Sequence, residues 1–284
     1  ATAAGVLFLY IAGKRLKVAV ASGDDGEAVA AAVVAAINAD VHLPVTAAVN
    51  GGTAEQVDIT AKNAGVEANN IDIRVNYYDD EALPPGVTAA ITAMSGGAGN
   101  PDIGDVVAVI GDEWYTDIVV PYTDASNLTA LKSELETRFG PMFKNPAHAY
   151  VAFAKTHANL ITEGENHNSP HLTAIGANAS PTAPYEWAAV TASVCAFYAK
   201  QDPARQFRTL RLQGLLPPKS DKLFTFAERD LLLRGGISTW NVDPDKTVRL
   251  ERVITTYREN AVGAADPSYL DLPTVKTVTY LRYD

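Results

Sequence analysis

Apolar residues along the chain follow two spacings, short continuous runs typical of strands and positions three or four apart typical of helices. From residue 101 onward the two patterns alternate. We predict helices over residues 101–110, 127–139, 156–164, 184–200 and 226–233. We predict strands over residues 116–121, 149–154, 172–175, 207–212, 236–240 and 247–250, the last extended by 252–257. Strands separated by helices predict an α/β fold, a mainly parallel sheet covered by helices on both faces.

Capping residues and turns set the expected ends of these elements. Thr225 followed by Glu228 is the spacing of a capping box, and Ser126 is the expected N-cap of helix 127–139. Residues 273–282 leave helix and strand both open, although apolar residues at intervals of three favour helix.

Residues 1–96 read as a smaller α+β domain that precedes the α/β domain. A hairpin is predicted over 6–11 and 16–20, an Ala-rich helix over 27–38, and strands over 45–49, 56–61, 71–77 and 87–93. The expected arrangement is one helix on one antiparallel sheet. Three glycines and a proline within residues 95–101 indicate a linker. We therefore place the domains at 1–96 and 97–284.

The charge and composition of the chain argue against nucleic acid and membrane as partners. The chain has a net charge of −10 and 47% hydrophobic residues. An acidic chain lacks the basic footprint that phosphate neutralisation requires, so direct nucleic-acid binding is not expected. The longest apolar run is too short for a bilayer span, and we expect no membrane partner. The single cysteine, Cys195, lies in an Ala-rich helix and is read as a buried hydrophobe.

The segment around Ser169 is the place where the sequence suggests chemistry. Ser169 lies between His167 and His171, a composition compatible with a hydrolase or with a two-histidine metal site. Pro170 disfavours the helix that such a metal site needs, and neither a nucleophile elbow nor a third ligand accompanies the motif. We favour a turn in which Asn and Ser side chains cap backbone groups, and we assign no catalytic residue, cofactor or metal.

A long stretch near the C-terminal end carries a family resemblance. The resemblance lies in the order and spacing of the following residues: Glu228-Arg229, residues 236–239, Glu251-Arg252, residues 254–257, Asp266, residues 268–271, Thr274 and residues 280–282. This stretch resembles the tail sheath proteins of contractile bacteriophages, most closely the Mu-like branch, and weaker agreement covers most of the chain.

The resemblance implies a structural function. It implies a larger domain of the subtilisin-like type, and subunits stacked in six-fold helical rings around a tail tube. Contraction of such a sheath drives the tube through the host envelope. The implied partners are copies of the chain itself, the tail tube and the baseplate, and the implied place is the virion tail, assembled in the bacterial cytoplasm. Neither enzyme activity nor a cofactor is implied.

In the family, N- and C-terminal arms add strands to a sheet of the neighbouring subunit. The chain is read as a trimmed core without these arms, so we expect it to be monomeric or weakly associated alone. Arg205, Arg208 and Arg211, with Lys219 and Lys222 nearby, form a basic concentration on this acidic chain. Its ordinary interpretation is a solvated face, and its sharper one is an inter-subunit contact with acidic surfaces.

Two other classes of function remain open at this point. A hydrolase would use the carboxyl edge of the parallel sheet, with a deep pocket near Tyr122, Thr156 and Gly176 and a Ser–His contact. A receptor-binding or adhesin-like module would present an exposed aromatic groove on residues 1–100.

Overall fold

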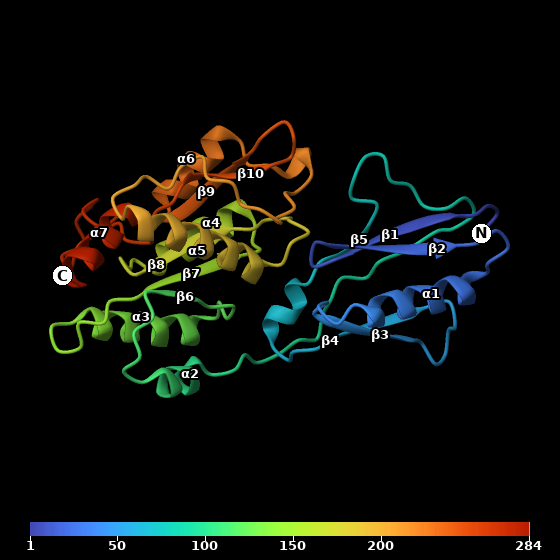
Figure 1. Cartoon of the computed structure of the whole chain (residues 1–284), viewed down its shortest axis with the longest axis horizontal. Coiled ribbons are helices and arrows are strands. Elements are labelled where there is room, and N and C mark those ends of the chain that lie inside the picture. The colour runs from blue at the N-terminus through green and yellow to red at the C-terminus, as the bar shows by residue number, and fades with distance from the viewer. Residues whose placement is uncertain (284) are drawn as a thin grey trace. The chain divides into compact units, whose positions relative to one another are not determined.

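A computed structural model describes residues 1–283, with side chains through Arg282. The chain divides into two compact units. The first comprises residues 1–100 with 181–183, and the second comprises residues 101–180 with the chain from Pro184 onward. Each unit is described by itself (Figure 1).

The first unit is built from two separate antiparallel sheets and one long helix. β1 (Gly5–Ile11) lies between β2 (Lys14–Val20) and β5 (Ile73–Val75), and β3 (Val45–Val49) pairs with β4 (Val57–Ala61). Helix α1 (Gly26–Ala39) contacts both sheets. The carboxylate of Asp25 caps it by accepting a hydrogen bond from the Ala28 N–H at 2.9 Å. A short 3-10 helix, Val66–Asn70, precedes β5.

Two expectations for this unit are wrong. The predicted single sheet is two sheets, and residues 87–93 form no strand. Apolar residues in this segment are mostly alanine, and its largest, Ile91, is 40% exposed. Such a segment offers too little side-chain surface for burial against a neighbour, so alternation alone does not make it a strand.

The second unit contains the five-stranded sheet, in the order β10-β9-β8-β7-β6. Its strands are β6 (Asp117–Val119), β7 (His148–Phe153), β8 (Leu172–Gly176), β9 (Ile237–Val242) and β10 (Val248–Arg252). β6 to β9 are parallel, and β10 pairs with β9 in the antiparallel sense. This is the mainly parallel α/β sheet that the alternating pattern predicts.

Helices accompany these strands in chain order (Figure 1). They are α2 (Ile103–Ile110), α3 (Ala125–Phe139), α4 (His157–Glu165), α5 (Pro184–Gln201), α6 (Phe226–Arg234) and α7 (Leu272–Tyr283), with a 3-10 turn at Ser220–Lys222. α7 resolves the ambiguity of residues 273–282 in favour of helix. No helix within residues 1–283 has the length and apolarity needed to cross a bilayer.

Successive side chains of β7 enter two different cores. Tyr150 and Ala152 belong to a cluster with Trp187 of α5. Val151 and Phe153 belong to another cluster with helices α3 and α4. Because neighbouring residues of a strand point to opposite faces, these two clusters place helices on both faces of the sheet. β7 is buried along its whole length, which explains its nearly continuous apolar sequence.

Several predicted boundaries need correction. The strand predicted as buried over 116–121 is the three-residue edge strand β6, which is only partly covered. Asp124 rather than Ser126 caps α3, because its carboxylate accepts from the Asn127 N–H at 3.1 Å. Helix α2 begins at Ile103, two residues after Pro101, with Asp102 as its cap.

The segments predicted as outer strands are less regular than expected. Residues 207–212 form no named strand, yet Thr209 and Leu212 donate backbone hydrogen bonds to carbonyls of β10 at 2.7 and 2.9 Å. This segment therefore continues the sheet beyond β10. Residues 253–257 do not extend β10, since a register irregularity lies between Leu250 and Arg252 and Ile254 bridges to Asp271 instead.

Candidate functional site

Ser169 has a structural environment rather than a catalytic one. Its N–H donates to the Thr256 hydroxyl at 3.0 Å, and that hydroxyl donates to the Ser169 carbonyl at 3.1 Å. The Ser169 hydroxyl accepts from the backbone N–H of His171 at 3.3 Å. These bonds hold a tight turn before β8, in which Ser169 caps backbone as the turn interpretation expects.

The imidazoles of His167 and His171 lie in different surroundings. The His171 ring packs on Phe139 with centroids 4.6 Å apart, and burial lowers its pKa to about 4. The His167 ring stacks parallel to Phe153 at 6.2 Å, and burial together with Lys132 lowers its pKa. Both rings are therefore neutral near pH 7. No group of three or more His, Cys, Asp or Glu within residues 1–283 is arranged to hold a metal ion.

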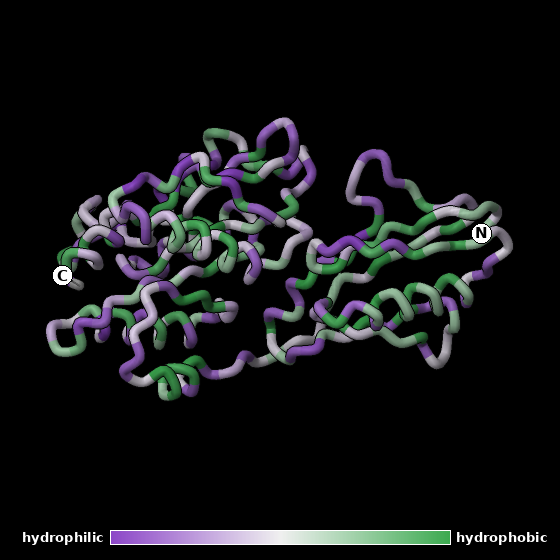
Figure 2. The backbone as a smooth tube through the Cα atoms, in the orientation of Figure 1, coloured by the Kyte–Doolittle hydropathy of each residue, from purple (hydrophilic) through white to green (hydrophobic). Residues whose placement is uncertain are grey.

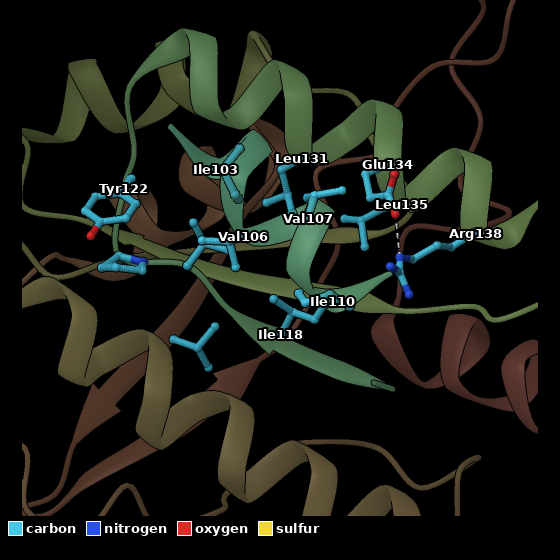
Figure 3. A pocket seen from close by; sticks show the side chains of 13 residues that line it. Ile103, Val106, Val107, Ile110, Ile118, Tyr122, Leu131, Glu134, Leu135 and Arg138 are labelled. Carbon is cyan, nitrogen blue, oxygen red and sulfur yellow. Dashed lines mark hydrogen bonds and ion pairs between the residues drawn. The ribbon is translucent and has the colours of Figure 1, made fainter. Parts of the chain in front are cut away.

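An apolar cavity of about 100 Å³ lies between α2, α3 and β6. Figure 3 shows Val107, Ile118 and Leu135 pointing into it, while Arg138 pairs with Glu134 at its rim, 2.7 Å apart. Tyr122 also lines this cavity. Helix α2, which forms one wall, is a strongly hydrophobic segment (Figure 2). With its apolar lining, this cavity offers packing space rather than reactive groups.

A second cavity, of about 10 Å³, lies beside Gly176 and is lined by Ser238 and Trp240. The Ser238 hydroxyl donates to the Ile254 carbonyl at 3.0 Å and so serves the backbone. No histidine lines either cavity. The hydrolase alternative expected a deep pocket with a Ser–His contact near these residues. The cavities at Tyr122 and at Gly176 contain no such contact.

Two of the basic residues singled out in the sequence, Arg208 and Arg211, lie in the segment that hydrogen-bonds to the outer side of β10, whereas Arg205 lies in the turn after α5. Arg205, Arg208 and Arg211 are exposed, whereas Phe207, Leu210 and Leu212 between them are buried. The Arg205 guanidinium lies over the Tyr198 ring, 4.1 Å from its centroid. None of these three arginines forms a close ion pair with a carboxylate of the described residues, but the Arg211 charge helps, after the hydrogen bonds from Thr247, to lower the pKa of Asp245. We call Arg205, Arg208 and Arg211 the basic edge.

The opposite edge of the same sheet carries the opposite charge. Residues 102–136 contain eight Asp and Glu against one Lys. Within residues 102–136, the exposed carboxylates that form no ion pair with the described residues are those of Asp102, Asp105, Asp112, Glu113 and Glu136. They lie on α2, on α3 and in the loop after α2, beside edge strand β6. We call these five residues the acidic edge. Sequence reasoning missed it, although the charge count of the segment was a usable signal.

Comparison with known proteins identifies the family. Residues 96–256 match the model of the phage tail sheath protein central domain. The chain belongs to the phage tail sheath family. This confirms the resemblance on which the structural interpretation rests, and the family is structural rather than catalytic.

A curated relative supports the Mu-like branch of the sheath family. The Mu-like prophage FluMu tail sheath protein of Haemophilus influenzae is 39% identical over 283 residues, which is 100% of this chain and 57% of the relative. The chain therefore spans little more than half of that sheath protein. Among solved structures, the sheath tail protein of Desulfitobacterium hafniense is similar with a TM-score of 0.47 and 11% identity, over 100% of this chain and 64% of that one.

The matched range covers the sheet of the second unit. Residues 96–256 run from before α2 to just beyond β10, so they include the whole five-stranded sheet. Both charged edges fall inside this range. Ser169, His167 and His171 also fall inside it, at the turn that precedes β8.

Proposed function

We propose that this chain is a structural subunit of a contractile phage tail sheath, which polymerises around the tail tube and contracts to drive it through the host envelope. The observation that carries the proposal is the family match over residues 96–256, extended by 39% identity to a Mu-like prophage tail sheath protein along the chain. The larger unit is, in this proposal, the subtilisin-like sheath domain, and residues 1–96 decorate it.

The mechanism proposed for the sheath is mechanical. Subunits move as nearly rigid bodies between two stackings, and contacts made in the shorter stacking release the free energy that moves the tube. A rigid body needs a well-packed interior, which the two clusters on the faces of β7 supply. Contacts between different surfaces of identical subunits continue into a helical stack, because they do not close on themselves.

The proposed partners are other copies of the chain, the tail tube and the baseplate, in a virion tail assembled in the bacterial cytoplasm. Direct contact with nucleic acid is not part of the proposal, because the net charge of −10 opposes phosphate binding. Arg205, Arg208 and Arg211 are proposed as inter-subunit contacts. Their exposure supports this role, as does the absence of a close ion pair with a carboxylate of the described residues.

Electron microscopy of the complete protein, expressed alone in bacteria, tests the proposed function. Striated tubes with a hollow centre and six-fold rings are the expected product of assembly-competent protein. Light scattering of residues 1–284 tests the separate expectation that this chain alone is monomeric or weakly associated. A stable hexamer or filament would overturn the expectation for the chain alone. Turnover of a substrate that is lost with Ser169→Ala and His171→Ala would count against a sheath.

A further inference from the structure

Two exposed groups of opposite charge lie toward opposite ends of one sheet. The acidic edge lies beside β6, the strand at one end of the order β10-β9-β8-β7-β6. Arg208 and Arg211 of the basic edge lie in the segment beyond β10, at the other end. Groups of opposite charge form an ion pair within one chain only where they lie in contact. These groups lie on separate sides of the second unit, so neither satisfies the other within one copy.

The acidic edge is built on rigid elements. The buried guanidinium of Arg138 donates to the carbonyl of Gly111 at 2.7 Å and to that of Glu113 at 2.9 Å. These bonds fix the loop that carries Asp112 and Glu113 to helix α3. A carboxylate group held in place loses less conformational entropy when it binds a cation, and it is therefore well suited to recognition.

Apolar side chains lie among these carboxylates. Val106 is 49% exposed, Val109 86% and Tyr115 52%. Interfaces between proteins combine an apolar centre with a charged rim, and tyrosine is enriched in them. The acidic edge thus has the composition of an interaction surface rather than that of a solvated helix face.

The basic edge has a similar composition with the sign of charge reversed. Arg205 is stacked on Tyr198, and the Tyr198 ring contacts the exposed Phe197 ring with centroids 5.2 Å apart. Stacking restricts the guanidinium without neutralising it. Arginine held in this manner still offers its hydrogen-bond donors to carboxylates of another molecule.

We infer that the acidic edge of one copy binds the basic edge of the next copy, in a head-to-tail contact along the direction of the sheet order. This inference rests on the proposed sheath function and adds to it the identity of two surfaces that meet. Every copy carries both edges on different sides, so the contact is heterologous and repeats from copy to copy. Charge complementarity sets register and orientation, and rejects pairing of two like edges.

Disulfide trapping tests this contact directly on the 284-residue chain. Glu113→Cys protein is mixed with an equal amount of Arg208→Cys protein and oxidised, while buried Cys195 stays out of the reaction. We expect heterodimers between the two variants to exceed the share given by random pairing at low ionic strength. High salt lowers that excess, because the Debye length falls from about 10 Å at 0.1 M to about 3 Å at 1 M.

In the matched control, Lys17→Cys protein takes the place of Arg208→Cys protein. Lys17 is an exposed lysine of β2 in the first unit. This control is expected to give only the share of random pairing with Glu113→Cys. An Arg208–Glu113 heterodimer yield equal to that of the control overturns the inference, whether or not the protein forms tubes.

Charge reversal in the complete protein separates the inference from the proposed function. Arg205→Glu/Arg208→Glu protein carries two acidic edges, and Asp105→Lys/Glu113→Lys protein carries two basic edges. We expect neither to form tubes alone and an equal mixture to recover them. If wild-type protein forms tubes and both variants also do so unchanged, the edge contact is wrong and the sheath function stands. Absence of tubes from wild-type protein counts against the function, and the trapping yield then decides the contact.

Discussion

Lys276 in α7 forms an ion pair with Asp117 in β6, across 159 residues of sequence. Their side chains are 6% and 17% exposed, so both charges are largely removed from water. The Lys276 ammonium also lies 5.7 Å from the centroid of the Tyr150 ring in β7. The pair therefore ties the last helix to the edge strand and to the core of the sheet.

Removal of this lysine is predicted to be costly. Lys276→Met leaves the Asp117 carboxylate partly buried and unpaired, and we expect the free energy of unfolding to fall by about 3–5 kcal/mol. The double variant Lys276→Met/Asp117→Asn removes both charges and should be more stable than Lys276→Met alone. Urea unfolding of the four proteins of this cycle gives the coupling free energy. A coupling near zero would show that water screens the pair.

Thr256 gives a second prediction, because its hydroxyl joins the segment after β10 to the turn before β8. It accepts from the Ser169 N–H and donates to the Ser169 carbonyl, at 3.0 and 3.1 Å. Thr256→Val keeps the shape and leaves these buried groups without a partner. We expect a loss of about 1–3 kcal/mol in the free energy of unfolding. Thr256→Ser keeps the hydroxyl and serves as the control, with a clearly smaller loss by the same measurement.

In the second unit, the features that depend only on neighbouring residues in the sequence were predicted correctly. The capping box of α6 is present as expected, with the Glu228 N–H bonded to the Thr225 hydroxyl and the Glu228 carboxylate bonded back to the Thr225 N–H. Such a motif depends on residues three apart and not on the rest of the fold. The same holds for α5, whose Pro184 start is predicted correctly.

Features set by distant parts of the chain could not be read in this manner. Residues 253–257 are rich in β-branched residues, yet Ile254 bridges to Asp271 and the Thr256 N–H binds the Leu172 carbonyl. The apolar run at β6 indicated a buried strand, because sequence does not show that β6 ends the sheet. The basic edge was visible as a charge cluster. Its acidic counterpart became recognisable only when the strand order placed the two at opposite ends.

A close approach between α4 and the start of β9 gives a third prediction. A Cβ atom at Gly164 would lie 1.9 Å from the Gly235 carbonyl oxygen, far inside van der Waals contact. Gly164→Ala therefore forces the backbone of α4 away from the α6–β9 junction. We expect this overpacking to lower the free energy of unfolding by about 1–3 kcal/mol or more. Thermal unfolding should show it as a lower midpoint temperature. Gly51→Ala is the control, since a Cβ there meets no atom within 4 Å, and its midpoint should stay near wild type.

Stability is also predicted to depend on His171 below neutral pH. Burial and the nearby Arg282 charge lower its native pKa to about 4, from an ordinary value of 6.5. As pH falls through 6.5 the unfolded chain takes up this proton first, so protonation favours unfolding. The contribution of His171 to the free energy of unfolding is therefore greatest above pH 6.5 and decreases progressively as the pH falls to about 4. This difference corresponds to at most about 3 kcal/mol.

His171→Phe tests this pH dependence, because an aromatic ring remains against Phe139 and the titrating group is removed. The difference in unfolding free energy between variant and wild type should shift in favour of the variant as pH decreases from 6.5 to 4. Urea unfolding at several pH values measures it. The slope should decrease without vanishing, since burial also lowers the pKa of His148 well below its ordinary value. His42→Gln, at an exposed position, is the control. Parallel profiles for His171→Phe and wild type would show that the native ring binds its proton as readily as the unfolded one.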